Sequence, residues 1–262
     1  MQEIWDLVVY NFVGVLVVFA RVMGIFTFNP ILGRSTVPMR VRVSMSIVLA
    51  LVMLYGMGDV IGYIPSSIPG FVMVLLAEAA LGFIFGFIVN LMLSVIIFAG
   101  KIIDNQITIA LAEVMDPSTG VTMPIMANLY YYLFVLYFFL TGAHLNYITL
   151  FHLSYQIIPI GFEFSLSWAG VSYTIALYLA NVLTLAVKMA MPVIAAEMIL
   201  QLCVGVMMKA VPSIQIFVIN IQMKILMGLF IIMAITVPMS DFIQELMDIM
   251  VDNLFGIMER LA

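Results

Sequence analysis

The chain has 262 residues, of which 65% are hydrophobic and 9% are charged, whereas soluble domains average roughly 45–50% and about 25%. So little polar surface excludes a water-soluble globule of this length and predicts an integral membrane protein. Nine Lys and Arg stand against fourteen Asp and Glu, with no basic block, which excludes a nucleic-acid-binding protein.

Six apolar runs are long enough to cross a membrane, since a spanning helix needs about 20 residues. In chain order they lie near Leu7 to Phe28, Val43 to Ile61, Phe71 to Phe98, Ile125 to Leu145, Val171 to Met191 or beyond, and Ile214 to Val237. The third run is longer than a bilayer requires, and Pro192 favours a kink in the fifth. The sequence therefore predicts an all-α integral membrane protein of about six long apolar helices, arranged as kinked helical hairpins.

The placement of cations predicts how these runs are oriented, because Lys and Arg in short loops are held in the cytoplasm. Arg34, Arg40 and Arg42 follow the first run, Lys101 follows the third and Lys209 follows the fifth. We therefore expect the connections after odd-numbered runs to be cytoplasmic and both termini to lie outside.

Beyond the last run, residues 241–262 carry acidic and apolar side chains at helical spacing. The acidic ones are Asp241, Glu245, Asp248, Asp252 and Glu259, opposite Phe242, Leu246, Ile249, Met250 and Phe255. This pattern predicts an acidic amphipathic helix, which is either solvated or interfacial, or a docking face for a partner.

A polar, turn-rich island from Gly100 to Pro124 separates the third and fourth runs. Irregular backbone at membrane depth is tolerated only where protein or a water-filled cavity satisfies its N–H and C=O groups. We therefore expect the island to line a passage. Its apolar side chains Leu111, Val114 and Met115 are able to close that passage, and the Asp116-Pro117 pair should fix the turn that presents them together.

Five ionisable residues fall inside the apolar runs, namely Arg21, Glu78, Lys188, Glu197 and Lys224. Arg21 and Glu78 can form a buried pair between the first and third runs, whereas Lys188 and Glu197 need other partners. Three roles stay open for these charges: ion pairs that fix packing, contacts between subunits, and a proton or ion relay. The relay would make the chain a proton-coupled secondary transporter using Arg21, Glu78 and Glu197 near the membrane midplane.

Other residues give weaker signals. Gly82 and Gly86 form a small-xxx-small face suited to close helix contact, and Cys203 is expected to be a small core residue. The 23 methionines are core filler or a compliant seal around a pore. His144 and His152 lack HExxH spacing, and no nucleophile elbow or nucleotide-binding motif occurs, so the sequence predicts no enzyme, cofactor or metal site.

Several patches together resemble the FliR/SctT/SpaR family of type III secretion export-gate proteins. They are ARVMGIFTFNPILGRSTVPMRVRVSMSIVLAL, AGKIIDNQITIALAEVMDPSTGVTMPI, the TGAH turn at Thr141 to His144, IIPIG at Ile157 to Gly161, and MPVIAAEMILQLCVGVMMKAVPSIQIFVINIQMKILMGL. Each patch is weak alone, but their order and spacing are specific and cover nearly the whole chain. The C-terminal hairpin departs from the family pattern, with Pro212 to Gln215 in place of P-Q-x-N, and Asn220, Gln222 and Lys224 in place of Gly-x-Pro-x-Lys.

The resemblance implies one export-gate domain with three parts: a FliP-like part over residues 1–170, a FliQ-like hairpin over 171–240 and the terminal helix over 241–262. It implies a hetero-oligomer with FliP-like and FliQ-like membrane subunits, beside FlhB-like and FlhA-like export components. The location implied is the bacterial inner membrane, multi-pass, in the flagellar basal body, with no cofactor.

The function implied by the resemblance is a closable channel for unfolded export substrates, in a flagellum or alternatively in an injectisome. The family's plug loop maps onto Ala110 to Met123, with Leu111 and Val114 at positions that are usually bulky and apolar. The tip of the FliQ-like hairpin, marked by Lys209, Pro212 and Gln215, would face the cytoplasm.

Overall fold

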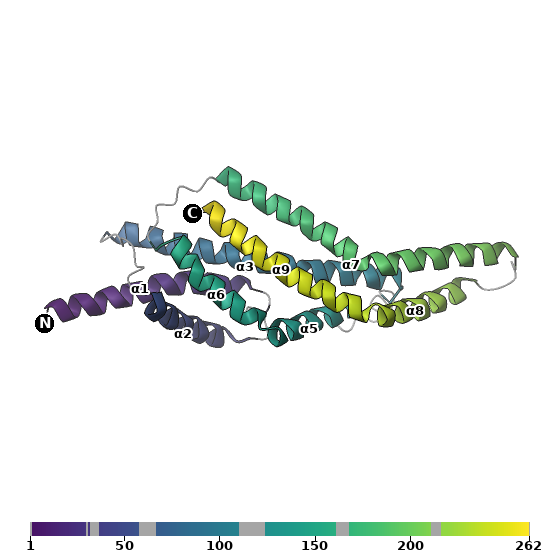
Figure 1. Cartoon of the computed structure of the whole chain (residues 1–262), viewed down its shortest axis with the longest axis horizontal. Coiled ribbons are helices and arrows are strands. Elements are labelled where there is room, and N and C mark those ends of the chain that lie inside the picture. The colour runs from purple at the N-terminus through teal and green to yellow at the C-terminus, as the bar shows by residue number, and fades with distance from the viewer. Residues whose placement is uncertain are drawn as a thin grey trace. The chain divides into compact units, whose positions relative to one another are not determined.

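The computed structural model describes the backbone of residues 2–29, 31, 37–57, 67–109, 124–160, 168–210 and 216–261. Side chains are described over the same ranges except at 2–11, 57, 168–172, 216–218 and 261. The described elements are all helices: α1 (Gln2–Phe28), α2 (Met39–Met57), α3 (Ile68–Gln106), α5 (Ile125–Leu140), α6 (Ala143–Ile157), α7 (Trp168–Ala210), α8 (Ile216–Ala234) and α9 (Thr236–Leu261) (Figure 1). The predicted all-α class is confirmed.

The chain folds into two compact units, which are described separately. Unit 1 comprises Met1–Leu91, Gly142–Leu177 and Ile249–Ala262, and unit 2 comprises Met92–Thr141 and Tyr178–Asp248. The predicted division into FliP-like and FliQ-like parts rests on the resemblance and not on compactness. It stays a prediction.

Several helices have the length and composition of membrane spans. Within the described residues, three qualify: Met39–Gly56 of α2, the whole of α3, and Tyr173–Ala210 of α7. The number rises to five if the α5–α6 pair and the α8–α9 pair each count as one broken span. The predicted helical membrane protein is therefore confirmed.

Two boundaries differ from the prediction. The fourth run was expected to reach Leu145, but α5 ends at Leu140, because Gly142 adopts a left-handed φ of 73° that a continuing helix does not allow. A separate helix, α6, follows and was not predicted, since side chains such as Asn146, His152 and Gln156 interrupt its apolar character. The polar island also starts later than expected, because α3 continues to Gln106.

In unit 1, α1 and α3 approach each other closely at glycines. A Cβ on Gly82 would overlap the carbonyl oxygen of Arg21, and a Cβ on Gly86 would lie 2.9 Å from another carbonyl oxygen of α1. From the opposite side, a Cβ on Gly24 would lie 2.7 Å from a carbonyl oxygen of α3. The predicted close contact at Gly82 and Gly86 is confirmed, and it brings the backbone at Arg21 against α3.

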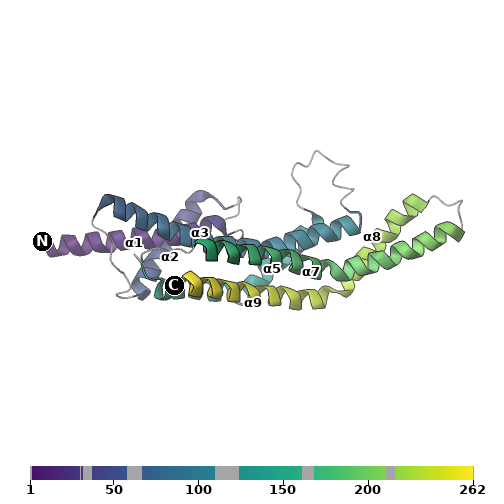
Figure 2. The ribbon, with the colours of Figure 1, turned by 90° about the horizontal axis from the view of Figure 1, so that it is seen from above.

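In unit 2, the C-terminal part of α7 and α8 form a helical hairpin, visible from two directions (Figures 1 and 2). Pro192 lies inside α7, and the ribbon of α7 changes direction along its length, as the predicted kink requires (Figure 1). Cys203 of α7 is exposed, contrary to the prediction of a core residue. It lies on a helix surface where Leu202 and Val206 are also exposed.

Helix α9 follows α8 after Ile235 and has the predicted amphipathic character. Its acidic residues Asp241, Glu245 and Asp248 are exposed, whereas Leu246 and Met250 are buried. Of the other predicted apolar residues, Phe242 and Ile249 are half-buried and Phe255 is exposed, so the chain covers the apolar side of α9 only in part.

Candidate functional site

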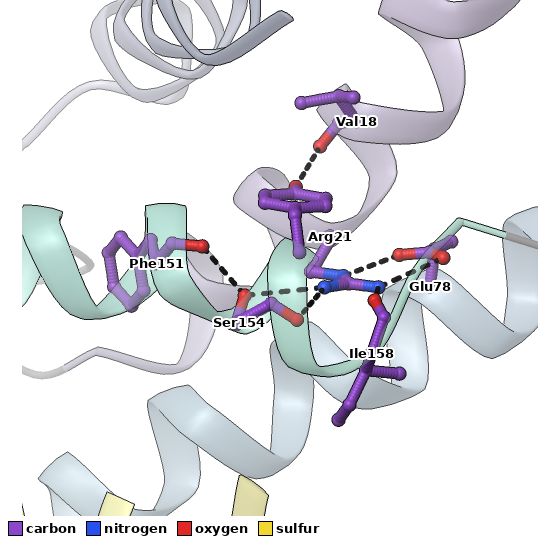
Figure 3. A network of polar contacts seen from close by, with 7 residues as sticks. Val18, Arg21, Glu78, Phe151, Ser154 and Ile158 are labelled. Carbon is purple, nitrogen blue, oxygen red and sulfur yellow. Dashed lines mark hydrogen bonds and ion pairs between the residues drawn. The ribbon is translucent and has the colours of Figure 1, made fainter. Parts of the chain in front are cut away.

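Arg21 is a fully buried cation in unit 1. Its guanidinium binds Glu78 of α3 through two bonds, from Nε to Oε2 at 2.5 Å and from Nη2 to Oε1 at 3.1 Å (Figure 3). This two-pronged geometry is the one in which Arg–carboxylate bonds are strongest. Glu78 is itself only 3% exposed, so neither charge is solvated by water.

The other donors of Arg21 reach the C-terminal end of α6 in the same unit. Nη1 donates to the carbonyl oxygen and the hydroxyl of Ser154 at 3.1 and 3.2 Å, and Nη2 donates to the carbonyl oxygen of Ile158 at 3.0 Å (Figure 3). The Ser154 hydroxyl in turn donates to the carbonyl oxygen of Phe151 at 2.7 Å. The C-terminal end of a helix carries partial negative charge, which favours the cation of Arg21 at this place.

Tyr155 completes the network around Arg21. Arg21 Cζ lies 4.1 Å from the centre of the Tyr155 ring, a cation–π contact, and the Tyr155 hydroxyl donates to the carbonyl oxygen of Val18 at 3.2 Å. The five N–H groups of a guanidinium are matched by five acceptor contacts. This satisfied arrangement suits a fixed joint between α1, α3 and α6 better than a proton relay, which needs a group that exchanges partners.

A second polar site lies in unit 2, where Asp104 of α3 caps the start of α5. Both oxygens of the Asp104 carboxylate accept from the backbone N–H of Met126, at 3.0 and 3.2 Å. The residue before α5 supplies no side-chain cap, so Asp104 provides in space the acceptor that an N-cap residue usually provides in sequence. Beside this bond, a Cβ on Gly100 would overlap the backbone of Ala127. The end of α3 and the start of α5 are therefore clamped together.

The end of α3 is also held against α8. Thr108 has a φ of 62°, a left-handed conformation that costs a β-branched residue about 1–2 kcal/mol and persists only where the surroundings impose it. Lys224 Nζ donates to the carbonyl oxygen of Gln106 at 3.5 Å. Next to it, Ile107 packs so closely on Gly228 that a Cβ on the glycine would overlap its side chain.

Glu197 of α7 lies in the same part of unit 2 and is completely buried. Among the described residues, neither of its carboxylate oxygens has a hydrogen-bond partner. A Cβ on Gly228 would lie 3.6 Å from Glu197 Oε1, and the charge of Lys224, one turn earlier on α8, acts on the carboxylate. One further turn back, the buried side-chain oxygen of Asn220 also lacks a partner within the described chain.

The predicted site residues lie in different parts of the structure. Arg21 and Glu78 meet in unit 1, Glu197 and Lys224 share one polar cluster in unit 2, and Lys188 is exposed on α7 and belongs to neither. Lys209 is exposed in the last turn of α7. The other predicted residues, Leu111, Val114, Met115, Asp116, Pro117, Pro212 and Gln215, lie outside the described residues.

Sequence reasoning missed the individual roles of Asp104, Gly100, Ser154 and Tyr155. A usable signal existed for Asp104, because α5 starts after a proline with no Ser, Thr, Asp or Asn at its N-cap position. Such a helix needs an acceptor from elsewhere, and Asp104 is an acidic residue on the other side of the island. No comparable signal identified Ser154 and Tyr155, which act through a helix that was not predicted.

We expect Asp104→Ala to loosen the start of α5, because the N–H of Met126 loses its acceptor. Loss of a cap costs about 1 kcal/mol, which corresponds to roughly fivefold faster amide exchange. Hydrogen–deuterium exchange of the peptide that begins at Ile125 measures the effect. Asn105→Ala removes an exposed neighbouring side chain and is the matched control. Equal exchange in the two variants would show that Asp104 does not cap α5.

Comparison with known proteins finds relatives along most of the chain. Residues 12–250 match the model of a family described as bacterial export proteins, family 1. The chain is 27% identical over 229 residues to the flagellar biosynthetic protein FliR of Bacillus subtilis, covering 86% of this chain and 85% of that protein. It is 26% identical over 236 residues to FliR of Caulobacter vibrioides, covering 88% and 93%. It is also 26% identical over 216 residues to the surface presentation of antigens protein SpaR of Shigella flexneri, covering 82% of each.

Proposed function

Because the chain belongs to family 1 of the bacterial export proteins, we propose that it is a membrane subunit of the type III protein export gate of a bacterial flagellum. The match over residues 12–250 carries the proposal, since it includes most of both units. The FliR relatives favour a flagellum, because those of B. subtilis and C. vibrioides cover 86% and 88% of the chain. The SpaR likeness, which covers 82%, keeps an injectisome gate as the second candidate.

The surface of the chain supports a place in a hetero-oligomer of the inner membrane. Helices α2 and α7 expose large apolar side chains, among them Val48, Val52, Tyr55, Leu183, Met198, Ile199, Leu202 and Val206. Apolar surface of this extent needs a cover of lipid or of neighbouring subunits. In this proposal the cover is lipid together with FliP-like and FliQ-like subunits, while FlhB-like and FlhA-like components deliver unfolded substrates. The location is the flagellar basal body.

Within the gate, we assign the closing element to Ala110 to Met123, with Leu111, Val114 and Met115 as the side chains that close the passage. Hydrophobic constrictions exclude water and ions by dewetting. The clamp described above supports the assignment, because Asp104 and Gly100 hold both ends of this segment at one place in unit 2.

The buried charges have structural roles in this proposal. The network around Arg21 fixes the packing of unit 1, because its donors are already engaged. The hairpin tip at Lys209, Pro212 and Gln215 faces the cytoplasm, as the placement of cations in the sequence predicts. A proton-coupled transporter gains no support from Arg21 and Glu78, which form a closed ion pair.

The proposal is tested by co-purification of the tagged chain from its own host in mild detergent. We expect FliP-like and FliQ-like proteins to be recovered with it, and a tagged unrelated inner-membrane protein serves as the control. A stable homo-oligomer that lacks both would contradict the gate and favour the transporter. Deletion of the gene should abolish flagellar filaments, whereas loss of effector secretion with intact filaments would favour the injectisome.

A further inference from the structure

Lys224 donates to one acceptor in unit 2, while the carboxylate of Glu197 lies beside Gly228, one helical turn further along α8. The Nζ of Lys224 donates to the backbone carbonyl of Gln106 at 3.5 Å, which is longer than the usual 2.7–3.2 Å of N–H···O bonds. The Glu197 carboxylate, on which the charge of Lys224 acts, has no hydrogen bond among the described residues. Both Glu197 and Lys224 are buried, at 0% and 8% exposure.

This arrangement is energetically unbalanced. A carboxylate attracts an ammonium through a full opposite charge, whereas a carbonyl oxygen offers only a partial one, and a buried carboxylate without a partner is costly. A carbonyl oxygen gives the ammonium less than Glu197 would. Something other than the hydrogen bond itself must therefore hold the end of α3 near Lys224.

The surroundings of the α3 end supply that restraint. Asp104 ties α3 to the start of α5, Ile107 fills the space left by the missing side chain of Gly228, and Thr108 is held in a left-handed conformation. These contacts define one position of the α3 end. If that end moves away, the carbonyl of Gln106 leaves Lys224, and the lysine needs another acceptor.

Glu197 is placed to be that acceptor. Its Oε1 lies beside Gly228, one helical turn after Lys224 on the same face of α8. The lysine side chain is a flexible four-carbon stem with a compact charge, so it can change partners without movement of the helix backbone. Asn220, one turn before Lys224, adds on the same face a second oxygen that has no hydrogen-bond partner within the described chain.

We propose that Lys224 is a positioning residue with two alternative partners: it holds the carbonyl of Gln106 while the end of α3 is in place, and it transfers to the carboxylate of Glu197 when that end is released. The exchange replaces one hydrogen bond by an ion pair and requires no proton transfer. Its consequence for export rests on the proposed function, whereas the exchange itself is a property of unit 2.

The test uses hydrogen–deuterium exchange of the peptide that contains Ile107 and Thr108, whose amides bond to the carbonyls of Ile103 and Asn105. In the purified complex, Lys224→Gln should speed this exchange about tenfold, because the charged donor to Gln106 is lost. Glu197→Gln should slow it below wild type, because the competing partner is weakened. The two substitutions therefore act in opposite directions.

The double variant Lys224→Gln/Glu197→Gln distinguishes a lysine with two alternative partners from a lysine in a permanent ion pair. It also covers the case in which Lys224→Gln alone does not fold. With two alternative partners, the double variant exchanges as fast as Lys224→Gln, since the carbonyl of Gln106 lacks its charged donor in both. With a structural pair, both single variants speed exchange, because each leaves one buried charge unpaired, and the double variant recovers part of that loss. That pattern, or no change in any variant, would overturn the proposal.

Matched controls are Lys188→Gln and Glu245→Gln, which remove an exposed lysine of α7 and an exposed carboxylate of α9. Neither should change exchange at Ile107 and Thr108. Inward leak of a small solute is measured in cells carrying the same variants, and we expect it to rise for Lys224→Gln and to fall for Glu197→Gln. If the two variants shift amide exchange in opposite directions but leave leak and export unchanged, the proposal that Lys224 has two alternative partners stands. The proposal that the chain is part of a gate is then contradicted.

Discussion

Replacing Arg21 by Met should greatly lower the amount of folded chain in the membrane. The substitution leaves Glu78 buried without a counter-charge and leaves the carbonyl oxygens of Ser154 and Ile158 without the cation that binds them. Breaking a buried pair by removing one partner costs about 3–5 kcal/mol, against total stabilities of about 5–15 kcal/mol. The measurements are the steady-state level of the chain by immunoblot and its unfolding temperature after purification in mild detergent.

Two comparisons make this result specific to the network. Arg40→Met removes an exposed arginine of α2 and should leave the level of the chain unchanged. Arg21→Met combined with Glu78→Leu removes both charges and should recover part of the loss, because well-packed apolar residues can replace a buried pair. An Arg21→Met chain as abundant as the Arg40→Met chain would show that the network does not fix the packing of unit 1.

Arg21→Lys distinguishes packing from a relay. A lysine keeps the charge but cannot make the two-pronged bond to Glu78 and reach the end of α6 at the same time. A joint that fixes packing therefore loses stability in this variant. A proton relay would instead give a stable chain with altered transport.

The class of the protein could be predicted from composition alone, because a chain with 65% hydrophobic and 9% charged residues has too few polar side chains to cover the surface of a soluble fold. The close contact at Gly82 and Gly86 could be predicted as well, since glycine spacing along one helix is a local property. The partner of Arg21 could only be guessed, because Glu78 is 57 positions away and pairing depends on how the helices pack. Lys188 lies in an equally apolar run yet is exposed, so a charge within such a run does not by itself reveal burial.

The clamp at Asp104 shows a second limit of sequence reasoning. Helix propensity and capping rules look at neighbours in the chain, whereas Asp104 and Met126 meet across the whole polar island. The same rules missed α6, where the hydroxyl of Tyr147 accepts a hydrogen bond at 3.2 Å from Asn29, a residue far away in the chain. The polar island itself could be predicted from the sequence. The structure adds that the helices on either side of it are joined by the bonds from Met126 to Asp104.

Replacing Leu111, Val114 and Met115 together by Gly should make the closed gate leak. Each apolar side chain contributes roughly 1.5–3 kcal/mol when it is buried, so the closed state should lose well over the 1.4 kcal/mol that corresponds to a tenfold change. We expect inward leak of small ions or solutes to rise at least about tenfold, with substrate export retained or moderately reduced. The helices and the clamp at Asp104 are untouched, so assembly with the FliP-like and FliQ-like subunits should survive.

The matched control places glycine at Ser118, Thr119 and Thr122, which adds the same number of glycines to the segment without removing apolar side chains. Added backbone freedom alone would then appear in both variants, whereas loss of the apolar seal appears only in the first. Co-purification confirms that both variants assemble before leak is compared. If the two assembled variants leak equally, the apolar side chains do not form the barrier. The segment between α3 and α5 is then a connector, and its clamped base serves only the packing of unit 2.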